Sequence, residues 1–275
     1  MIMRTDYSVC MSVYIKDNPT DFKEAVLSIY NQTCPPDEII LVIDGPVPDM
    51  MLKTIETLSK KTGIMKVIPL PKNMGHAIAR QTGLEAARNE LCAVMDADDL
   101  SVPNRFEKQL KAFEEHPEVS VVGGLINEFI HATANVVGTR IVPEKDSDIK
   151  EYLKSRCPMN LVTVMLKKRD VMKVGGYQDW YCEEDYYLWI RLALGGYKFY
   201  NIQENLVNVR VGEEMYQRRG GKKYFESEAR LQKYMLYNKL ISWPKYAYNV
   251  TIRWAVQVAM PNWLRGWVFR TFARN

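Results

Sequence analysis

Three aspartates follow directly after a short apolar run in the segment AVMDADDL, residues 93–100. Alternate residues of an extended chain share a face, so Asp96 and Asp98 can converge on one ligand while Asp99 turns away or caps the next element. Carboxylates this close have raised pKa values unless a cation compensates their repulsion. Two converging hard oxygen ligands suit Mg2+ or Mn2+ that keeps water and phosphate oxygens as its other ligands. The segment predicts a divalent-cation site, with a solvated exit from a strand as the alternative.

A second acidic cluster begins the segment EEDYYLWIRLAL, whose apolar spacing predicts a helix over residues 183–194. Glu183, Glu184 and Asp185 fall in its first turn, where the helix dipole stabilises negative charge, so a purely structural role is one interpretation. A carboxylate placed opposite a reacting group can instead take a proton as a general base. On these residues alone both interpretations stay open.

The elements that must position these clusters alternate between strands and helices in the first hundred residues. We expect strands at 7–15, 37–44, 65–70 and 90–96, with helices at 19–33, 50–61 and 75–89 between them. This alternation predicts an α/β fold with a parallel sheet covered by helices. Ligands of such sheets collect beyond the carboxyl ends of the strands. Asp44 and Asp96 both end strands, so we expect them to face one crevice.

The second half of the chain continues with a less regular order of elements. We expect helices at 104–115, from Pro143 to about 156, and at 183–194, and strands at 119–130, 136–142, 161–168 and 198–211. The sequence shows no internal repeat and no low-complexity segment.

Composition and charge restrict the class of protein. The 275 residues are 47% hydrophobic and 25% charged, as in an ordinary globular chain. Five scattered cysteines lack the spacing of a zinc site and favour a reducing, intracellular compartment. No run of about 18 apolar residues is present, so a membrane-spanning helix is not expected. No nucleic-acid partner is expected either.

The C-terminal tail differs in charge from the rest of the chain. The last acidic residue is Glu228, and four of the six tryptophans come after it, at Trp243, Trp254, Trp263 and Trp267. Unopposed basic residues with Trp and Tyr are typical of an anchor at a membrane interface. The alternative is that residues 246–260 pack on the main domain, with their aromatic side chains as core.

Eight segments resemble family 2 glycosyltransferases in the same order, and they cover roughly residues 7–215. They are SVYIKDNP, EAVLSIYNQT, PDEIILVIDG, KNMGHAIARQTGL, MDADD, PNRFEKQ, VGGY and EEDYYLWIRLALGGYKF. The chain looks most like the bacterial branch that assembles O-antigen, capsule and exopolysaccharide. The resemblance implies a GT-A fold, which is Rossmann-like with a mostly parallel central sheet, a nucleotide-sugar donor, and a DxD motif that binds Mn2+ or Mg2+.

The same resemblance assigns roles to individual residues on the donor side. Asp96 and Asp98 match the DxD motif, with Asp96 facing the ribose and the metal-bound diphosphate and Asp98 as principal metal ligand. Asp44 matches the last acidic residue of the DDGS turn, which helps to read uracil. Ile43 replaces the preceding Asp, so recognition of the base there would rest on one carboxylate. The alternative is that Asp44 only forms the turn before Gly45.

Two further donor-side residues match less closely. Arg80 matches the Arg of an ARN segment near base or phosphate, with Gln81 in place of Asn, and its alternative is an exposed helix arginine. Tyr14 lies near the positions of the first strand that contact the base, although YIKDN replaces the commoner IIPTYN. We therefore expect Tyr14, Asp44, Arg80, Asp96 and Asp98 to bind the nucleotide sugar.

On the acceptor side, Glu184 and Asp185 match the family's ED pair, and Asp185 is the position of the general base. Trp180 could be a platform for an acceptor sugar ring or a buried aromatic. One base and one displacement invert the anomeric centre, so a UDP-α-sugar would give a β-linkage. The QxxRW motif and membrane spans of processive members are absent from the sequence, which predicts a single addition.

The resemblance also implies an organisation for the whole chain. Residues 1–215 would form the GT-A domain, with 1–102 binding the nucleotide sugar and 103–215 the acceptor, and 216–275 would form a helical, membrane-associating extension. The expected reaction moves a hexose from a nucleotide sugar to a saccharide on polyprenyl diphosphate. UDP-galactose and UDP-glucose are the favoured donors. The enzyme would be cytoplasmic and peripheral to the inner face of the membrane.

Other functions are compatible with an acidic motif on an α/β sheet. A Mg-dependent sugar nucleotidyltransferase needs a glycine-rich first loop, and YIKDNPTD contains no glycine. A haloacid-type phosphatase places its DxDxT motif after the first strand, whereas this motif comes after the fourth. A non-catalytic membrane-docking module would explain the tail but neither acidic cluster.

Overall fold

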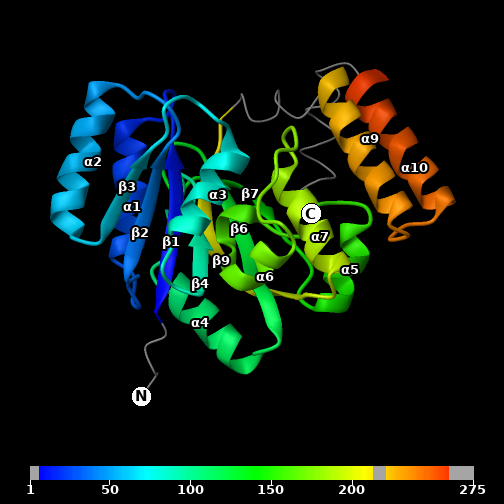
Figure 1. Cartoon of the computed structure of the whole chain (residues 1–275), viewed down its shortest axis with the longest axis horizontal. Helices are drawn as coiled ribbons and strands as arrows, with labels where there is room; N and C mark the ends of the chain where they lie inside the picture. The colour runs from blue at the N-terminus through cyan, green and yellow to red at the C-terminus, as the bar shows by residue number, and fades with distance from the viewer. Residues whose placement is uncertain (1–5, 213–220, 260–275) are drawn as a thin grey trace.

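A nine-stranded mixed sheet runs through the molecule in the order β3-β2-β1-β4-β8-β6-β9-β5, with β7 paired to β6 (Figure 1). This computed structural model describes residues 6–212 and 221–259. The strands are β1 Tyr7–Val13, β2 Glu38–Ile43, β3 Met65–Pro69, β4 Leu91–Val94, β5 Leu100–Ser101, β6 Val119–Phe129, β7 Val136–Arg140, β8 Met165–Lys167 and β9 Lys198–Arg210. The helices are α1 Pro19–Tyr30, α2 Asp49–Thr62, α3 His76–Ala86, α4 Arg105–Glu115, α5 Asp146–Leu153, α6 Lys168–Lys173, α7 Glu184–Leu194, α9 Lys222–Tyr237 and α10 Trp243–Trp254, with 3-10 turn Leu161–Thr163 and π-helical turn Ala255–Ala259.

The first half of the sheet has the α/β pattern that the sequence predicts. Strands β3, β2, β1 and β4 run parallel to one another. Alternation along β1 directs Val9 and Met11 into the core that contains Phe22 of α1, while Cys10 joins the opposite core with Leu84 of α3. Both faces of these strands are covered, so their carboxyl ends are the accessible edge.

The second half of the sheet is mixed. Strand β8 pairs antiparallel with both β4 and β6, whereas β9 runs parallel to β6. The expected strand over 161–168 is only partly correct, because Leu161–Thr163 is a 3-10 turn and Met165–Lys167 is the strand. The sequence did not predict the two-residue strand β5, which comes after the acidic motif and pairs with β9. Such a short strand has no periodicity to detect.

Helices α9 and α10 form a hairpin at one side of the molecule, beside α7 and away from α1 and α2 (Figure 1). Leu231 and Met235 of α9 share one core with Leu188 of α7. Within residues 6–212 and 221–259, no helix has the length and apolar character needed to cross a membrane. The tail residues Trp263 and Trp267 lie outside the described residues, and the division of the chain near residue 215 stays a prediction.

Candidate active site

The acidic motif forms the turn between β4 and β5, at the carboxyl edge of the parallel strands. Asp98 is exposed and Asp96 is half-buried, whereas Asp99 is 2% exposed. The Asp99 carboxylate accepts a hydrogen bond from the backbone N–H of Arg210 at 2.9 Å. Asp99 therefore turns inward, away from the exposed side of the motif, as the spacing predicts, and it attaches β9 to the acidic turn.

A fully buried arginine fixes the two ends of this turn. Arg105, the first residue of α4, donates to the backbone oxygen of Val94 at 2.9 Å and to Ser101 Oγ at 3.0 Å. Burial lowers the pKa of Arg105 to about 9, while the nearby Asp99 acts in the opposite direction. The positive charge beneath the turn stabilises both the geometry and the negative charge of the motif, a role to which no sequence motif pointed.

The acidic turn has an electrostatic environment that suits a cation. Desolvation by surrounding protein atoms, followed by repulsion from Asp96, raises the pKa of Asp98 to about 6, although this side chain still reaches solvent. Burial together with Asp98 and Asp96 likewise raises the pKa of Asp17 to about 6. Asp17 lies in the loop after β1, and no motif in the sequence singled it out. The excess negative charge favours binding of a divalent ion.

The residues present fit a metal that completes its coordination with substrate and water. The described part of the chain contains no group of three or more His, Cys, Asp or Glu side chains arranged to hold a metal ion. Asp96 and Asp98 would supply two oxygen ligands, which is the number that Mg2+ uses when phosphate oxygens provide the others. Arg210 limits the motion of this site, because its Nε donates to the backbone oxygen of Asp98 at 3.2 Å.

One guanidinium joins the two acidic clusters. Arg80 of α3 donates from Nη2 to Asp96 Oδ1 at 3.3 Å and from Nη1 to Glu184 Oε1 of α7. Burial opposes the charge on Arg80, but the attraction of Asp96 and Glu184 outweighs it and raises its pKa. The alternative of an exposed helix arginine is wrong, because the Arg80 side chain is 10% exposed. The acidic turn and the start of α7 therefore open on one site.

Asp185 sits next to this ion pair in a partly enclosed environment. Its Oδ1 accepts from the Tyr186 backbone N–H at 2.7 Å, and its Oδ2 lies 3.8 Å from Cys157 Sγ. Burial and the adjacent Glu184 raise the pKa of Asp185, whereas Arg80 and Arg140 act to lower it. A carboxylate with a raised pKa is a better proton acceptor, which suits the predicted general base.

A small pocket between helix α3 and the C-terminal halves of β1 and β4 reaches the residues that join the two acidic clusters. Its lining includes Ser12, Arg80, Asp96 and Tyr177. The hydroxyl group of Tyr177 is buried and has no hydrogen-bond partner among the described residues. The pocket is mostly apolar, and its few polar groups lie at or beside the residues that join the two acidic clusters.

Asp44 does not line this pocket, and its carboxylate already accepts two hydrogen bonds. The two oxygens accept from the backbone N–H groups of Met74 at 2.6 Å and Gly75 at 3.1 Å. These bonds hold the loop before α3, so contact with a base would require the oxygens to accept additional hydrogen bonds. Tyr14 is half-buried near this loop, with its ring centroid 6.4 Å from that of His76. Base recognition by both residues stays a prediction.

Trp180 lies in an aromatic cluster between the main domain and the hairpin. Its ring centroid is 4.4 Å from that of Tyr187, and the guanidinium carbon of Arg230 lies 4.2 Å from the ring. Its indole N–H donates to the Ser227 backbone oxygen at 3.3 Å. These contacts favour the buried-aromatic alternative, and the platform for an acceptor sugar stays a prediction.

Comparison with known proteins agrees with this geometry. The family model described as Glycosyl transferase family 2 matches residues 8–175. A UDP-Gal:alpha-D-GlcNAc-diphosphoundecaprenol beta-1,3-galactosyltransferase of Escherichia coli is 35% identical over 269 residues, which cover 98% of this chain and 97% of that protein. The amylovoran biosynthesis glycosyltransferase AmsE of Erwinia amylovora is 35% identical over 231 residues, covering 84% of this chain and 85% of that protein.

Solved structures support the fold. The mannosyltransferase PcManGT from Pyrobaculum calidifontis, solved in complex with GDP-Man and Mn2+, aligns with a TM-score of 0.63 at 16% identity. The alignment covers 99% of this chain and 80% of that structure. The predicted GT-A arrangement of sheet and helices is confirmed. From the family match and the full-length relatives, the chain is a glycosyltransferase and belongs to glycosyl transferase family 2.

Proposed function

We propose that this enzyme transfers one hexose from UDP-galactose or UDP-glucose to a saccharide on a polyprenyl diphosphate, with inversion to a β-linkage. The Escherichia coli relative of similar length carries the name of a galactosyltransferase that acts on GlcNAc-diphosphoundecaprenol. The Erwinia relative is named for biosynthesis of amylovoran. These names support a step in the synthesis of a bacterial surface polysaccharide such as O-antigen or capsule.

The observation that carries this proposal is the pairing of Arg80 with both Asp96 and Glu184. Asp96 belongs to the motif expected to meet the donor diphosphate, and Glu184 precedes the expected base. The three groups come from the end of β4, from α3 and from α7, so the contact depends on the folded chain. Donor and acceptor would therefore react at the position where these elements meet.

Side chains of this enzyme would assist both the deprotonation of the acceptor hydroxyl and the departure of UDP. Asp185 would accept the proton of the acceptor hydroxyl as that oxygen attacks the anomeric carbon and UDP departs. Arg80 holds α7, which carries Asp185, against the acidic turn that contains Asp96. This contact would fix the relative orientation of the two substrates. A Mn2+ or Mg2+ ion held by Asp96 and Asp98 would supply Lewis-acid stabilisation of the departing diphosphate.

A donor panel tests this function directly. Wild-type enzyme, radiolabelled UDP-hexoses and a synthetic GlcNAc-diphosphate-lipid are expected to give a β-linked disaccharide, and excess EDTA should reduce turnover by at least about a hundredfold. Added Mn2+ or Mg2+ should restore it. Pyrophosphate exchange without transfer would indicate a nucleotidyltransferase, and release of inorganic phosphate alone would indicate a phosphatase. Membrane binding with no turnover of any nucleotide sugar would indicate that the protein is a non-catalytic membrane-docking module.

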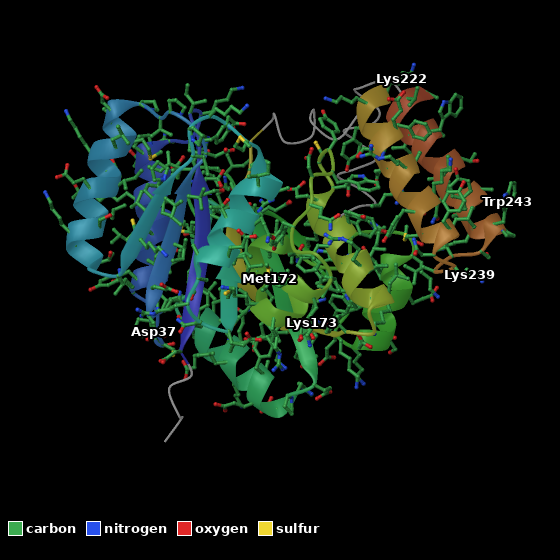
Figure 2. The ribbon with its side chains drawn as sticks, viewed as in Figure 1. Asp37, Met172, Lys173, Lys222, Lys239 and Trp243 are labelled. Atoms are coloured by element: carbon green, nitrogen blue, oxygen red, sulfur yellow. The ribbon has the colours of Figure 1, made fainter. Side chains whose placement is uncertain are left out.

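We further propose that the enzyme works at the inner face of the cell membrane and docks through α10. Helix α10 and the turn after it carry exposed large apolar side chains, which are Trp243, Tyr248, Ile252, Trp254 and Val258. Figure 2 shows Trp243 at the outer side of the molecule. No Asp or Glu follows Glu228 in the sequence, and Glu228 itself pairs with Arg253, so the positive charge of this region is only partly opposed. Aromatic and cationic groups together suit an anionic lipid surface.

Replacing two of these aromatic residues is expected to weaken binding to vesicles that contain phosphatidylglycerol. For the double variant Trp243→Ser and Tyr248→Ser we expect a loss of about tenfold or more, because less apolar area enters the interface. Co-sedimentation measures the effect. The matched control is Met50→Ser with Leu52→Ser, two exposed residues on α2 at the far side of the molecule. Equal binding by both variants would contradict docking through α10.

A further inference from the structure

An acceptor carried on a diphosphate brings two negative charges to the acceptor side of the site. If the attacking hydroxyl meets Asp185, the diphosphate lies one pyranose ring away from that carboxylate. Asp185 and Glu184 would repel it, so a cation must stand close to the base without being neutralised by it. This requirement rests on the proposed function, and it restricts which of the described residues could bind the diphosphate.

Most arginines near the site already have carboxylate partners. Arg80 pairs with Asp96 and Glu184, Arg210 pairs with Asp21 and Glu24, and Arg253 pairs with Glu228. A phosphate would have to displace these carboxylates before it could bind. These three guanidinium groups are therefore poor candidates.

Arg140 differs from them. Its guanidinium donates one hydrogen bond, from Nη2 to the Cys157 backbone oxygen at 2.7 Å, and it has no carboxylate partner within 4.0 Å among residues 6–212 and 221–259. A guanidinium has five N–H donors, so several stay available for a ligand. The side chain is half-buried, where a charged hydrogen bond is stronger than at a fully hydrated surface.

The same cysteine connects Arg140 to the base. The carbonyl group of Cys157 holds Arg140, and its Sγ lies 3.8 Å from Asp185 Oδ2. Arg140 is at the end of β7, opposite Ile126 of β6, and its own backbone oxygen accepts from Asn160 Nδ2 at 3.4 Å. The backbone of Arg140 is thus held by strand and loop, and its guanidinium is held by Cys157, the residue that also lies beside the carboxylate expected to receive the acceptor proton.

We propose that Arg140 binds the diphosphate of the lipid-linked acceptor. A planar guanidinium can bind a phosphate through two parallel hydrogen bonds, and it keeps its charge at any physiological pH. The contact would place the reducing end of the acceptor sugar beside β7 and its attacking hydroxyl at Asp185. The ligand class recognised is a glycosyl diphosphate, whatever the lipid attached to it.

Arg140→Gln tests this proposal with a pair of acceptors that differ only in the diphosphate. One is GlcNAc-diphosphate-undecyl and the other is the neutral undecyl glycoside of GlcNAc. We expect kcat/KM for the diphosphate acceptor to fall about ten- to a hundredfold, mainly through KM, since one or two charge-assisted hydrogen bonds are lost. Transfer to the neutral acceptor and the Kd for UDP should change less than about twofold.

Three controls separate diphosphate binding from other effects. Arg140→Lys keeps the charge but loses the planar donor pair, so an intermediate loss is expected. Arg169→Gln changes an arginine that is 65% exposed and lies beside Glu90, at the other end of β4 from the acidic motif, and it should match wild type. Undecyl diphosphate without sugar should compete with the acceptor, and Arg140→Gln should raise its inhibition constant about tenfold or more. A UDP Kd equal to wild type shows that each variant is folded.

The outcomes distinguish this inference from the proposed function. Equal losses on both acceptors, or an unchanged inhibition constant for undecyl diphosphate, would overturn the assignment of Arg140 while leaving glycosyl transfer intact. If the wild-type enzyme does not use the neutral glycoside as an acceptor, the inhibition constant of undecyl diphosphate alone tests whether Arg140 binds the diphosphate. Failure of the wild-type enzyme to transfer a hexose to either acceptor would count against the proposed function itself.

Discussion

Asp98→Asn is expected to reduce turnover by about a thousandfold or more, because loss of the principal metal-binding carboxylate removes charge stabilisation of the departing UDP. The structure makes this an informative substitution. Asp98 is exposed at the tip of the turn, and its carboxylate accepts no hydrogen bond from the side chain of any other described residue. Its backbone oxygen, which accepts from Arg210, is unchanged in the variant. The melting temperature should therefore stay within about 2 °C of wild type.

Binding of Mn2+ in the presence of UDP, measured by calorimetry, provides the second readout. We expect the variant to bind Mn2+ at least about tenfold more weakly than wild type. Asp148→Asn is a matched control, since Asp148 is an exposed aspartate on α5 whose side chain contacts Ser147. Wild-type turnover and Mn2+ affinity in Asp98→Asn would show that the acidic turn is only a solvated strand exit.

Asp185→Asn is expected to reduce kcat by about a hundred- to ten-thousandfold while leaving the Kd for UDP within about twofold. The residue would act on the acceptor hydroxyl, and its own contacts are with Tyr186 and Cys157 rather than with the acidic turn. Glu184→Gln should behave differently. Glu184 pairs with Arg80, which also holds Asp96, so that variant should raise KM for the donor.

The pH dependence of the wild-type enzyme gives an independent check on the base. Burial and Glu184 raise the pKa of Asp185, so its active, ionised form is lost as the pH falls through a value above the ordinary 3.8. We expect kcat to fall on the acid side, and this limb should be absent from the residual rate of Asp185→Asn. Asp179→Asn, an exposed neighbour, should keep the wild-type profile. Retention of wild-type kcat in Asp185→Asn would remove the residue from the mechanism.

Local patterns in the chain were enough to predict most elements and the types of chemistry. Strands and helices of the first half were expected within a few residues of their observed bounds, because apolar periodicity and caps such as Asn18 are read from neighbouring positions. The divergence of Asp99 from Asp96 and Asp98 also results from the two-residue period of an extended chain. Short elements were less predictable, since β5 and β8 have two and three residues.

Only the tertiary structure decides which of these residues lie close enough to act together. Arg80 and Glu184 are 104 positions apart, and Arg210 and Asp98 are 112 apart, so no local pattern connects either pair. The fold likewise brought Arg140 and Asp185 to the same cysteine. Periodicity specifies which face of a segment is buried. It does not specify which distant segment covers that face, because that depends on how the sheet orders its strands and how the helices pack on it.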